Sequence, residues 1–420
     1  MAVKLVYLIF WRIIFVKNVK NNQKLYQLFT ADALSEIGDV FYYVALITYA
    51  SQLTNSSLAI SLVTTLEFIP PVFSIIIGPI ADKLCNKTKV SMIVNILQCT
   101  LYLINGLIFL KFQKWTLFGL CLTINFISDT LGIITQEMEP IILKKLSPQI
   151  SYEKKYGWLS AVAQSFSIGG KFLGGVLLTV MNNHYIFMSF INAATFGCAA
   201  VAMALIGNVI TKKETQSEKD EKNGALEGIR FLKDNTKVRF IVVLLSNINI
   251  VLAPILPIAY ILLADKEMYS PVNYSMSVSL LTAIDSLASI LGPTFGLRLF
   301  KGKKALINSV MVGSIFSAIF CLSIFTRNIY VLMLTLFLAS FFIGATIPLL
   351  FGGVMKNVPE SKIGSVNGVI DTLLAITPPL STFIFSSSVQ YVSAFVNIAI
   401  LSVFSVCLIL IIVKNKRNLF

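Results

Sequence analysis

Twelve long apolar segments are the feature that most constrains the fold of this 420-residue chain. An α-helix of about 20 residues crosses the roughly 30 Å hydrocarbon core of a bilayer. A chain inside lipid must pair all of its backbone polar groups, which leaves helices and closed barrels as spanning structures. The pattern therefore predicts an all-α polytopic membrane protein with twelve transmembrane helices. The expected spans are Leu25–Leu53, Ser57–Ala81, Val90–Leu110, Trp115–Met138, Tyr156–Met181, Tyr185–Gly207, Phe240–Leu263, Tyr274–Phe300, Ala305–Phe325, Ile329–Met355, Ile363–Val389 and Tyr391–Val413.

Composition supports a membrane protein and argues against several other classes. The chain is 56% hydrophobic and 13% charged, whereas soluble domains carry about 25% charged residues. Its net charge of +14 comes from basic residues between the apolar segments, so we expect no nucleic-acid partner. The six cysteines lie mostly inside apolar runs, without the spacing of a metal site. No glycine-rich phosphate loop is present, and we expect neither an enzyme nor a cofactor.

The distribution of basic residues predicts the orientation of the chain. Counting from a cytoplasmic N-terminus, 29 of the 34 Lys and Arg residues fall in the inner segments. Four lie in outer turns, and Lys171 lies inside a span. Cytoplasmic loops of membrane proteins carry such an excess of positive charge. We therefore expect a multi-pass protein of a cell (plasma) membrane, of bacterial type, with both termini in the cytoplasm.

The chain divides into two halves of six spans at its longest polar segment. Gly78-Pro79 near the end of span two and Gly292-Pro293 near the end of span eight are each followed by basic residues. This repeated motif predicts a parallel repeat, with the halves related by a pseudo-two-fold axis. The expected domains are residues 1–24, a cytoplasmic segment with an interfacial helix; 25–207, the N-terminal half; 208–239, a cytoplasmic linker with a short surface helix; 240–413, the C-terminal half; and 414–420, a cytoplasmic tail.

Span one carries Asp32, Glu36 and Asp39, at positions i, i+4 and i+7 of one helix face. Carboxyl groups at membrane depth are costly, and they normally point into a bundle or a water-filled cavity. An interhelical hydrogen bond is the structural alternative for each of them. Glu137 and Glu139, near the end of span four, are interpreted as interfacial. The other intramembrane acids expected to line a cavity or couple to protons are Glu67, Asp129, Asp285 and Asp371.

The segment from Gly78 to Lys89 resembles the loop between helices two and three of the major facilitator superfamily. The matching residues are Gly78, Ala81, Asp82, Lys83 and Lys87, and the departures are Ile80, Cys85 and Asn86. The resemblance implies an inner gate formed by Gly78, Asp82, Lys83 and Lys87, with the acid near a helix N-terminus. A loop that merely carries positive charge is the alternative.

Four further stretches resemble the drug-exporter branch that includes macrolide-efflux proteins. They are Ser35-Glu36-Ile37-Gly38-Asp39, Asn55-Ser56-Ser57, Glu227-Gly228-Ile229-Arg230-Phe231-Leu232 and Val358-Pro359-Glu360.

Span five adds Gly169-Gly170-Lys171-Phe172-Leu173-Gly174-Gly175, which resembles an antiporter motif with Lys171 where that motif has Pro. Small residues allow close helix packing, whereas a lysine at mid-depth requires a carboxylate or water. Asp285 is an attractive partner because helices five and eight are neighbours in the resembling family, and the sequence leaves open which acid Lys171 contacts. A structural ion pair without a transport role is the alternative.

The resemblance implies a secondary active transporter that exports a hydrophobic or amphipathic compound in exchange for protons. Its expected partners are a small-molecule substrate, protons and the lipid bilayer, and we expect a monomer. The alternatives within transport are an importer or facilitator of a small polar nutrient and a siderophore exporter. The alternative from another class is a non-transporting membrane scaffold or immunity protein.

Overall fold

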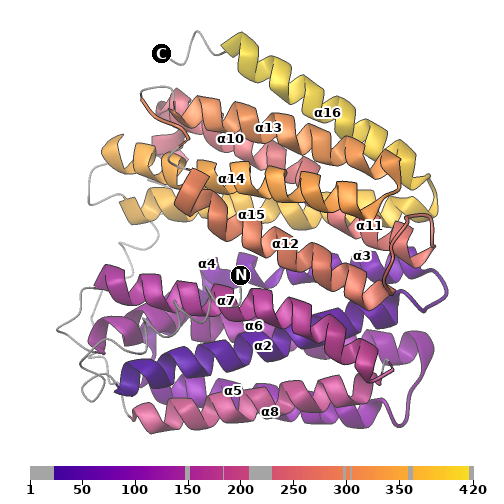
Figure 1. Cartoon of the computed structure of the whole chain (residues 1–420). Coiled ribbons are helices and arrows are strands. Elements are labelled where there is room, and N and C mark those ends of the chain that lie inside the picture. The colour runs from indigo at the N-terminus through magenta and orange to yellow at the C-terminus, as the bar shows by residue number, and fades with distance from the viewer. Residues whose placement is uncertain are drawn as a thin grey trace. The chain divides into compact units, whose positions relative to one another are not determined.

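The computed structural model of the chain (Figure 1) describes residues 23–146, 152–182, 184–207, 229–296, 299–302, 305–357 and 363–415. Within these ranges the chain consists of helices joined by turns, with an isolated parallel bridge between Tyr269 and Asn328. The prediction of an all-α polytopic fold is confirmed.

The helices follow one another through the whole chain. Their bounds are α2 Gln23–Ala50, α3 Ser56–Glu67, η2 Pro70–Phe73, α4 Ser74–Lys83, α5 Lys87–Ile108, α6 Lys114–Lys145, α7 Tyr152–Val180, α8 Tyr185–Ile206, α10 Thr236–Leu252, α11 Ile255–Ala264, α12 Tyr274–Phe295, α13 Ala305–Ser323, η4 Ile324–Thr326, α14 Ile329–Asn357, α15 Ile363–Ser387, η6 Ser388–Gln390 and α16 Ala394–Asn415.

Ten segments among the described residues are long and apolar enough to cross a membrane. α2 and α7 are also long enough, with 28 and 29 residues. α2 carries three carboxyl groups, Asp32, Glu36 and Asp39, and is therefore less apolar than most of the other spans. Together these segments correspond to the twelve predicted spans.

Two spans are broken by proline. In span two, α3 ends at Glu67 and the chain passes through η2 before α4 begins. In span seven, α10 ends at Leu252 and α11 begins after Pro254. Proline has no backbone N–H and its ring clashes with the preceding turn, so it interrupts the helical hydrogen-bond ladder.

Two helices begin at an asparagine whose side chain replaces a missing backbone partner. The Asn86 side chain accepts a hydrogen bond from the Lys89 backbone N–H at 3.2 Å, at the start of α5. The Asn273 side chain accepts one from the Met276 N–H at 3.0 Å, at the start of α12. Asparagine is a preferred residue at this position because its oxygen satisfies an orphan donor of the first turn.

The chain forms two compact units, and the boundary between them falls at the break in span two. The first unit contains Met1–Tyr49 and Phe73–Glu214, and the second contains Ala50–Val72 and Thr215–Phe420. α4 packs on α6 within the first unit, whereas α3 packs on α11 and α15 within the second. The first portion of span two, α3, therefore belongs to the same compact unit as the C-terminal spans.

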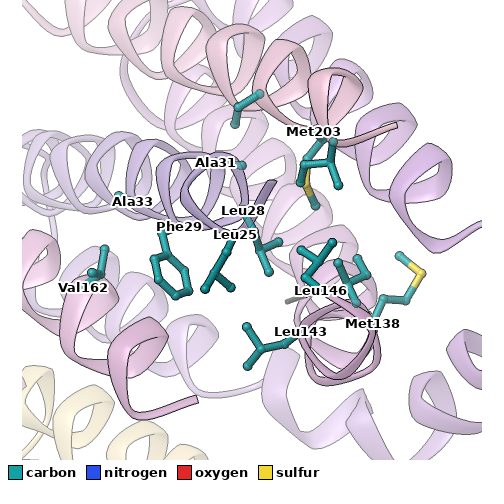
Figure 2. Close-up of a cluster of buried hydrophobic side chains, with 14 of the residues drawn as sticks. Leu25, Leu28, Phe29, Ala31, Ala33, Met138, Leu143, Leu146, Val162 and Met203 are labelled. Carbon is teal, nitrogen blue, oxygen red and sulfur yellow. The ribbon is translucent and has the colours of Figure 1, made fainter. Parts of the chain in front are cut away.

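The core of the first unit is a cluster of apolar side chains drawn mainly from four helices (Figure 2). From α2 it takes residues at helical spacing, beginning with Leu25, Leu28 and Phe29, which are all at most 4% exposed. Residues from α6, α7 and α8 join them, among them Leu143 and Met203. Burial of this stripe fixes α2 in the unit and thereby sets the direction in which its carboxylates point.

Two predicted elements lie mainly outside the described residues. The interfacial helix expected within residues 1–24 falls there except for Gln23 and Lys24, which open α2. The linker at 208–239 is described from residue 229 onward, and residues 229–234 are helical.

Candidate functional site

Three half-buried carboxyl groups project from one face of α2. Asp32, Glu36 and Asp39 all lie in this helix with intermediate exposure. The helix is about 42 Å long at 1.5 Å per residue, which places Asp39 near its middle and Asp32 nearer its first residue. Two separate polar groupings form within the first unit, one around Asp32 and one around Asp129 of α6.

The first grouping is a carboxyl pair between α2 and α6. Asp32 is hydrogen-bonded to Glu139, and Glu36 lies close enough to both to interact electrostatically. Two carboxyl groups can form a hydrogen bond only when one of them carries the proton, because ionised carboxylates are acceptors only. The arrangement can therefore hold one shared proton.

Glu139, which the sequence interpretation places at the membrane interface, takes part in this pair. It is half-buried and contacts a carboxyl group on another helix. The sequence carries a sign of this contact. Asp32 lies nine residues after the start of α2, and Glu139 lies six residues before the end of α6. The two helices run in opposite directions in the predicted topology, so these positions reach comparable depths.

The second grouping surrounds Asp129 on α6. The Asn125 amide donates a hydrogen bond to the Asp129 carboxylate at 2.7 Å. The Asn125 carbonyl accepts one from the hydroxyl of Tyr102 on α5 at 2.9 Å. Tyr102 also lies within electrostatic reach of Asp39. This phenol is thus placed between two mid-span carboxylates.

Asp39 has an equivalent partner on α8. The Asn192 amide donates to Asp39 at 3.4 Å. The Thr195 hydroxyl donates to the Asn192 backbone carbonyl at 2.8 Å and also lies 3.3 Å from the Asn192 side-chain oxygen. Gly38 makes this contact possible, because a Cβ atom there would overlap the polar atoms of Asn192 and Thr195. Each mid-span acid therefore accepts a hydrogen bond from an asparagine side chain.

A third polar group in the same unit contains no carboxylate. The Asn105 amide donates hydrogen bonds to the Tyr42 hydroxyl and to Ser189. Tyr42 is 1% exposed, and Asn105 and Ser189 are fully buried. This group fastens α2, α5 and α8 together, and it offers no charge to a ligand.

α7 packs closely on α2 through the glycines that flank Lys171. A Cβ atom on Gly170 would meet Val40 at 3.5 Å, and one on Gly174 would meet Phe41 at 3.2 Å. This is the close approach that the small residues of span five predict. Lys171 is half-buried on the same helix.

The remaining predicted acids belong to the second unit. Glu67 is exposed at the end of α3, where the proline break begins. Asp285 on α12 accepts a hydrogen bond from Ser340 on α14. Asp371 lies on α15, and its side chain falls outside the described part of the structure. The predicted pairing of Lys171 with Asp285 joins the two units and stays a prediction.

The Major Facilitator Superfamily pattern matches residues 28–376, more than three quarters of the chain. The chain belongs to this superfamily. The match runs from α2 to α15 and thus includes the first-unit carboxyl groups and both broken spans. It leaves the macrolide-efflux branch a prediction.

A comparison with a bacterial protein agrees with the superfamily assignment. The uncharacterized MFS-type transporter YfiS of Bacillus subtilis (strain 168) is 27% identical over 220 residues. That alignment covers 51% of this chain, and the chain matches about half the length of YfiS.

Solved structures with the same fold have much lower sequence identity. A POT family transporter in complex with a thioalcohol-conjugated peptide has a TM-score of 0.70 at 13% identity, over 94% of this chain and 96% of its own. The nucleoside transporter NupG has a TM-score of 0.66, at 14% identity over 92% of this chain and 98% of its own. At these identities the likeness shows the fold alone.

The superfamily loop between α4 and α5 is held by Lys87. Its ammonium group is buried and donates hydrogen bonds to the carbonyls of Ala81 at 2.7 Å and Leu84 at 3.3 Å. Gly78, Asp82 and Lys83 lie on α4, and their side chains fall outside the described set. The predicted inner-gate role of these four residues stays a prediction.

Proposed function

We propose that the protein is a secondary active transporter that exports a hydrophobic or amphipathic compound in exchange for protons. In this proposal the two halves of the molecule expose a central site alternately to each side of the membrane. The family assignment supports transport. The coupling to protons rests on one observation, the hydrogen-bonded carboxyl pair of Asp32 and Glu139.

The pair suits proton coupling for a physical reason. A proton shared by two carboxyl groups is retained while both groups stay close together and shielded from water. If movement separates them or admits water, both acids can ionise and the proton leaves. Exchange of the shared proton for substrate would then link the conformational cycle to the proton gradient.

Proton movement in proteoliposomes tests the proposal directly. The protein is reconstituted with a pH-sensitive dye inside the vesicles, and a proton gradient is imposed with and without tetraphenylphosphonium or erythromycin. We expect substrate-dependent proton flux through the wild-type protein. Glu139→Gln and Asp32→Asn should each reduce this flux to background, because a neutral amide cannot release the shared proton.

The matched control is Glu137→Gln, two residues away on the same helix. This variant should keep the wild-type flux, which separates loss of the pair from general damage to α6. Substrate export that proceeds without proton movement in the wild-type protein would contradict the coupling. Uptake of a small polar nutrient in place of export would favour the importer, and the absence of any transport would favour the scaffold.

A further inference from the structure

An asparagine donates its side-chain N–H group to each of the two mid-span acids, Asn125 to Asp129 and Asn192 to Asp39. The Asn125 contact is the shorter, at 2.7 Å against 3.4 Å. The side-chain carbonyl of Asn125 also accepts a hydrogen bond from the Tyr102 hydroxyl at 2.9 Å. An N–H donor aimed at a carboxylate favours its ionised form.

Tyr102 is held rigidly, and it therefore orients Asn125. The phenol is 0% exposed. Its ring stacks on Phe196 with centroids 5.7 Å apart, and it meets the Tyr42 ring edge-on at 4.8 Å. Because its hydroxyl occupies the Asn125 carbonyl, the amide turns its N–H group toward Asp129. Tyr102 and Asn125 thus fix the orientation of the Asp129 carboxylate.

An aromatic side chain lies about one helical turn from this carboxylate on α6. Phe126 is three residues before Asp129 and so lies on a neighbouring part of the same helix face. Its ring meets that of Phe73 edge-on, with centroids 6.3 Å apart. Both rings, like Asp129, are only half-buried. An oriented carboxylate beside partly accessible aromatic rings has the chemistry that recognises an organic cation with an apolar body.

We propose that Tyr102 and Asn125 are positioning residues that hold Asp129 for the positively charged group of an amphipathic substrate. The inference rests on the proposed export function and specifies its substrate class. Tyr102 acts through Asn125, and Asn125 acts through Asp129. Asp39, within electrostatic reach of Tyr102, is a second anion that adds to the attraction for a cation.

The test compares a permanent lipophilic cation with a neutral compound. Transport of tetraphenylphosphonium and of chloramphenicol is measured in proteoliposomes for the wild-type protein, Tyr102→Phe and Asn125→Leu. Both variants should raise the KM for tetraphenylphosphonium about tenfold, the change expected when a hydrogen bond to a charged group is lost. The KM for chloramphenicol should stay within about twofold, because a neutral compound gains little from an oriented carboxylate.

Two further variants separate positioning from stability. Tyr42→Phe removes an equally buried phenol hydroxyl from the group that contains no carboxylate, and it should leave the ratio of the two KM values unchanged. Asn125→Ser keeps a donor near Asp129 and should restore part of the affinity for the cation. A merely structural role of Asn125 would change both KM values together, and this result would overturn the inference.

A binding measurement distinguishes this inference from the proposed function. Titration calorimetry of tetraphenylphosphonium with the purified full chain requires no transport. A wild-type protein that binds the cation but moves no compound would contradict the export function alone. Equal binding to the wild-type protein and Asn125→Leu, or no binding to either, would contradict the inference even where export is observed.

Discussion

Lys87 is 1% exposed, although lysine is among the residues that are least often buried. Its position follows from the end of α4, where backbone carbonyls have no partner within the helix. The ammonium group donates to two carbonyls there, at Ala81 and Leu84. A positive charge at a helix C-terminus is also favoured by the helix dipole. The side chain therefore stabilises the loop between α4 and α5.

Removing this ammonium group should destabilise the protein. Lys87→Met keeps the apolar stem but removes the side-chain donor from the carbonyls of Ala81 and Leu84, of which Ala81 keeps the Leu84 backbone N–H, at a cost of about 1–3 kcal/mol. We expect a lower midpoint of thermal unfolding in detergent, measured by size-exclusion chromatography after heating. Lys89→Met is the control, because Lys89 is exposed, and it should leave the midpoint unchanged. Equal midpoints for the two variants would show that the Lys87 contacts contribute little.

At the scale of helices, α12 and α14 approach each other closely in the second unit. A Cβ atom on Gly292 would overlap the backbone carbonyl of Phe341, and one on Gly296 would overlap the side chain of Ala345. Two small residues four positions apart let helices pack at short distance in a membrane. This packing also brings Asp285 within hydrogen-bond distance of Ser340.

Gly292→Ala should separate these two helices. The added methyl group meets backbone atoms, which cannot rotate away, so we expect a loss of about 1–3 kcal/mol and a lower thermal midpoint. Gly119→Ala on α6 is the control, since a Cβ atom there meets nothing within 4 Å. A midpoint for Gly292→Ala equal to that of the control would mean that the α12–α14 contact is looser than described.

At the scale of the whole molecule, the bias of positive charge predicts that both termini lie in the cytoplasm. In that orientation the exposed turn after α13, at Arg327, is expected to face the outside. The exposed residue Lys301, between α12 and α13, is expected to face the inside.

Thiol labelling tests this orientation. In a background without the native cysteines, Arg327→Cys should react with a membrane-impermeant maleimide in intact cells. Lys301→Cys should react only after the membrane is permeabilised. The reverse pattern would place the termini outside, and labelling of both positions in intact cells would contradict the assignment of spans between them.

The sequence by itself determined the features that depend on neighbouring residues. The length of each apolar run predicted the spans, and the i, i+4, i+7 spacing placed Asp32, Glu36 and Asp39 on one helix face. Small residues in span five predicted its close packing, which Gly170 and Gly174 display against α2. These properties are local, because helix periodicity and the cost of placing polar backbone in lipid act along a single segment.

Only the tertiary structure decided which side chains meet. It brought Glu139 to Asp32, two residues that are 107 positions apart, and Tyr102 to Asn125 across two helices. It also placed α3 with the helices of the second unit. Each outcome depends on the rotation, depth and packing of separate helices, and no pattern within one segment specifies these. A hydrogen bond between helices is selected by the geometry of both, so the sequence supplied the candidate acids and the fold supplied their partners.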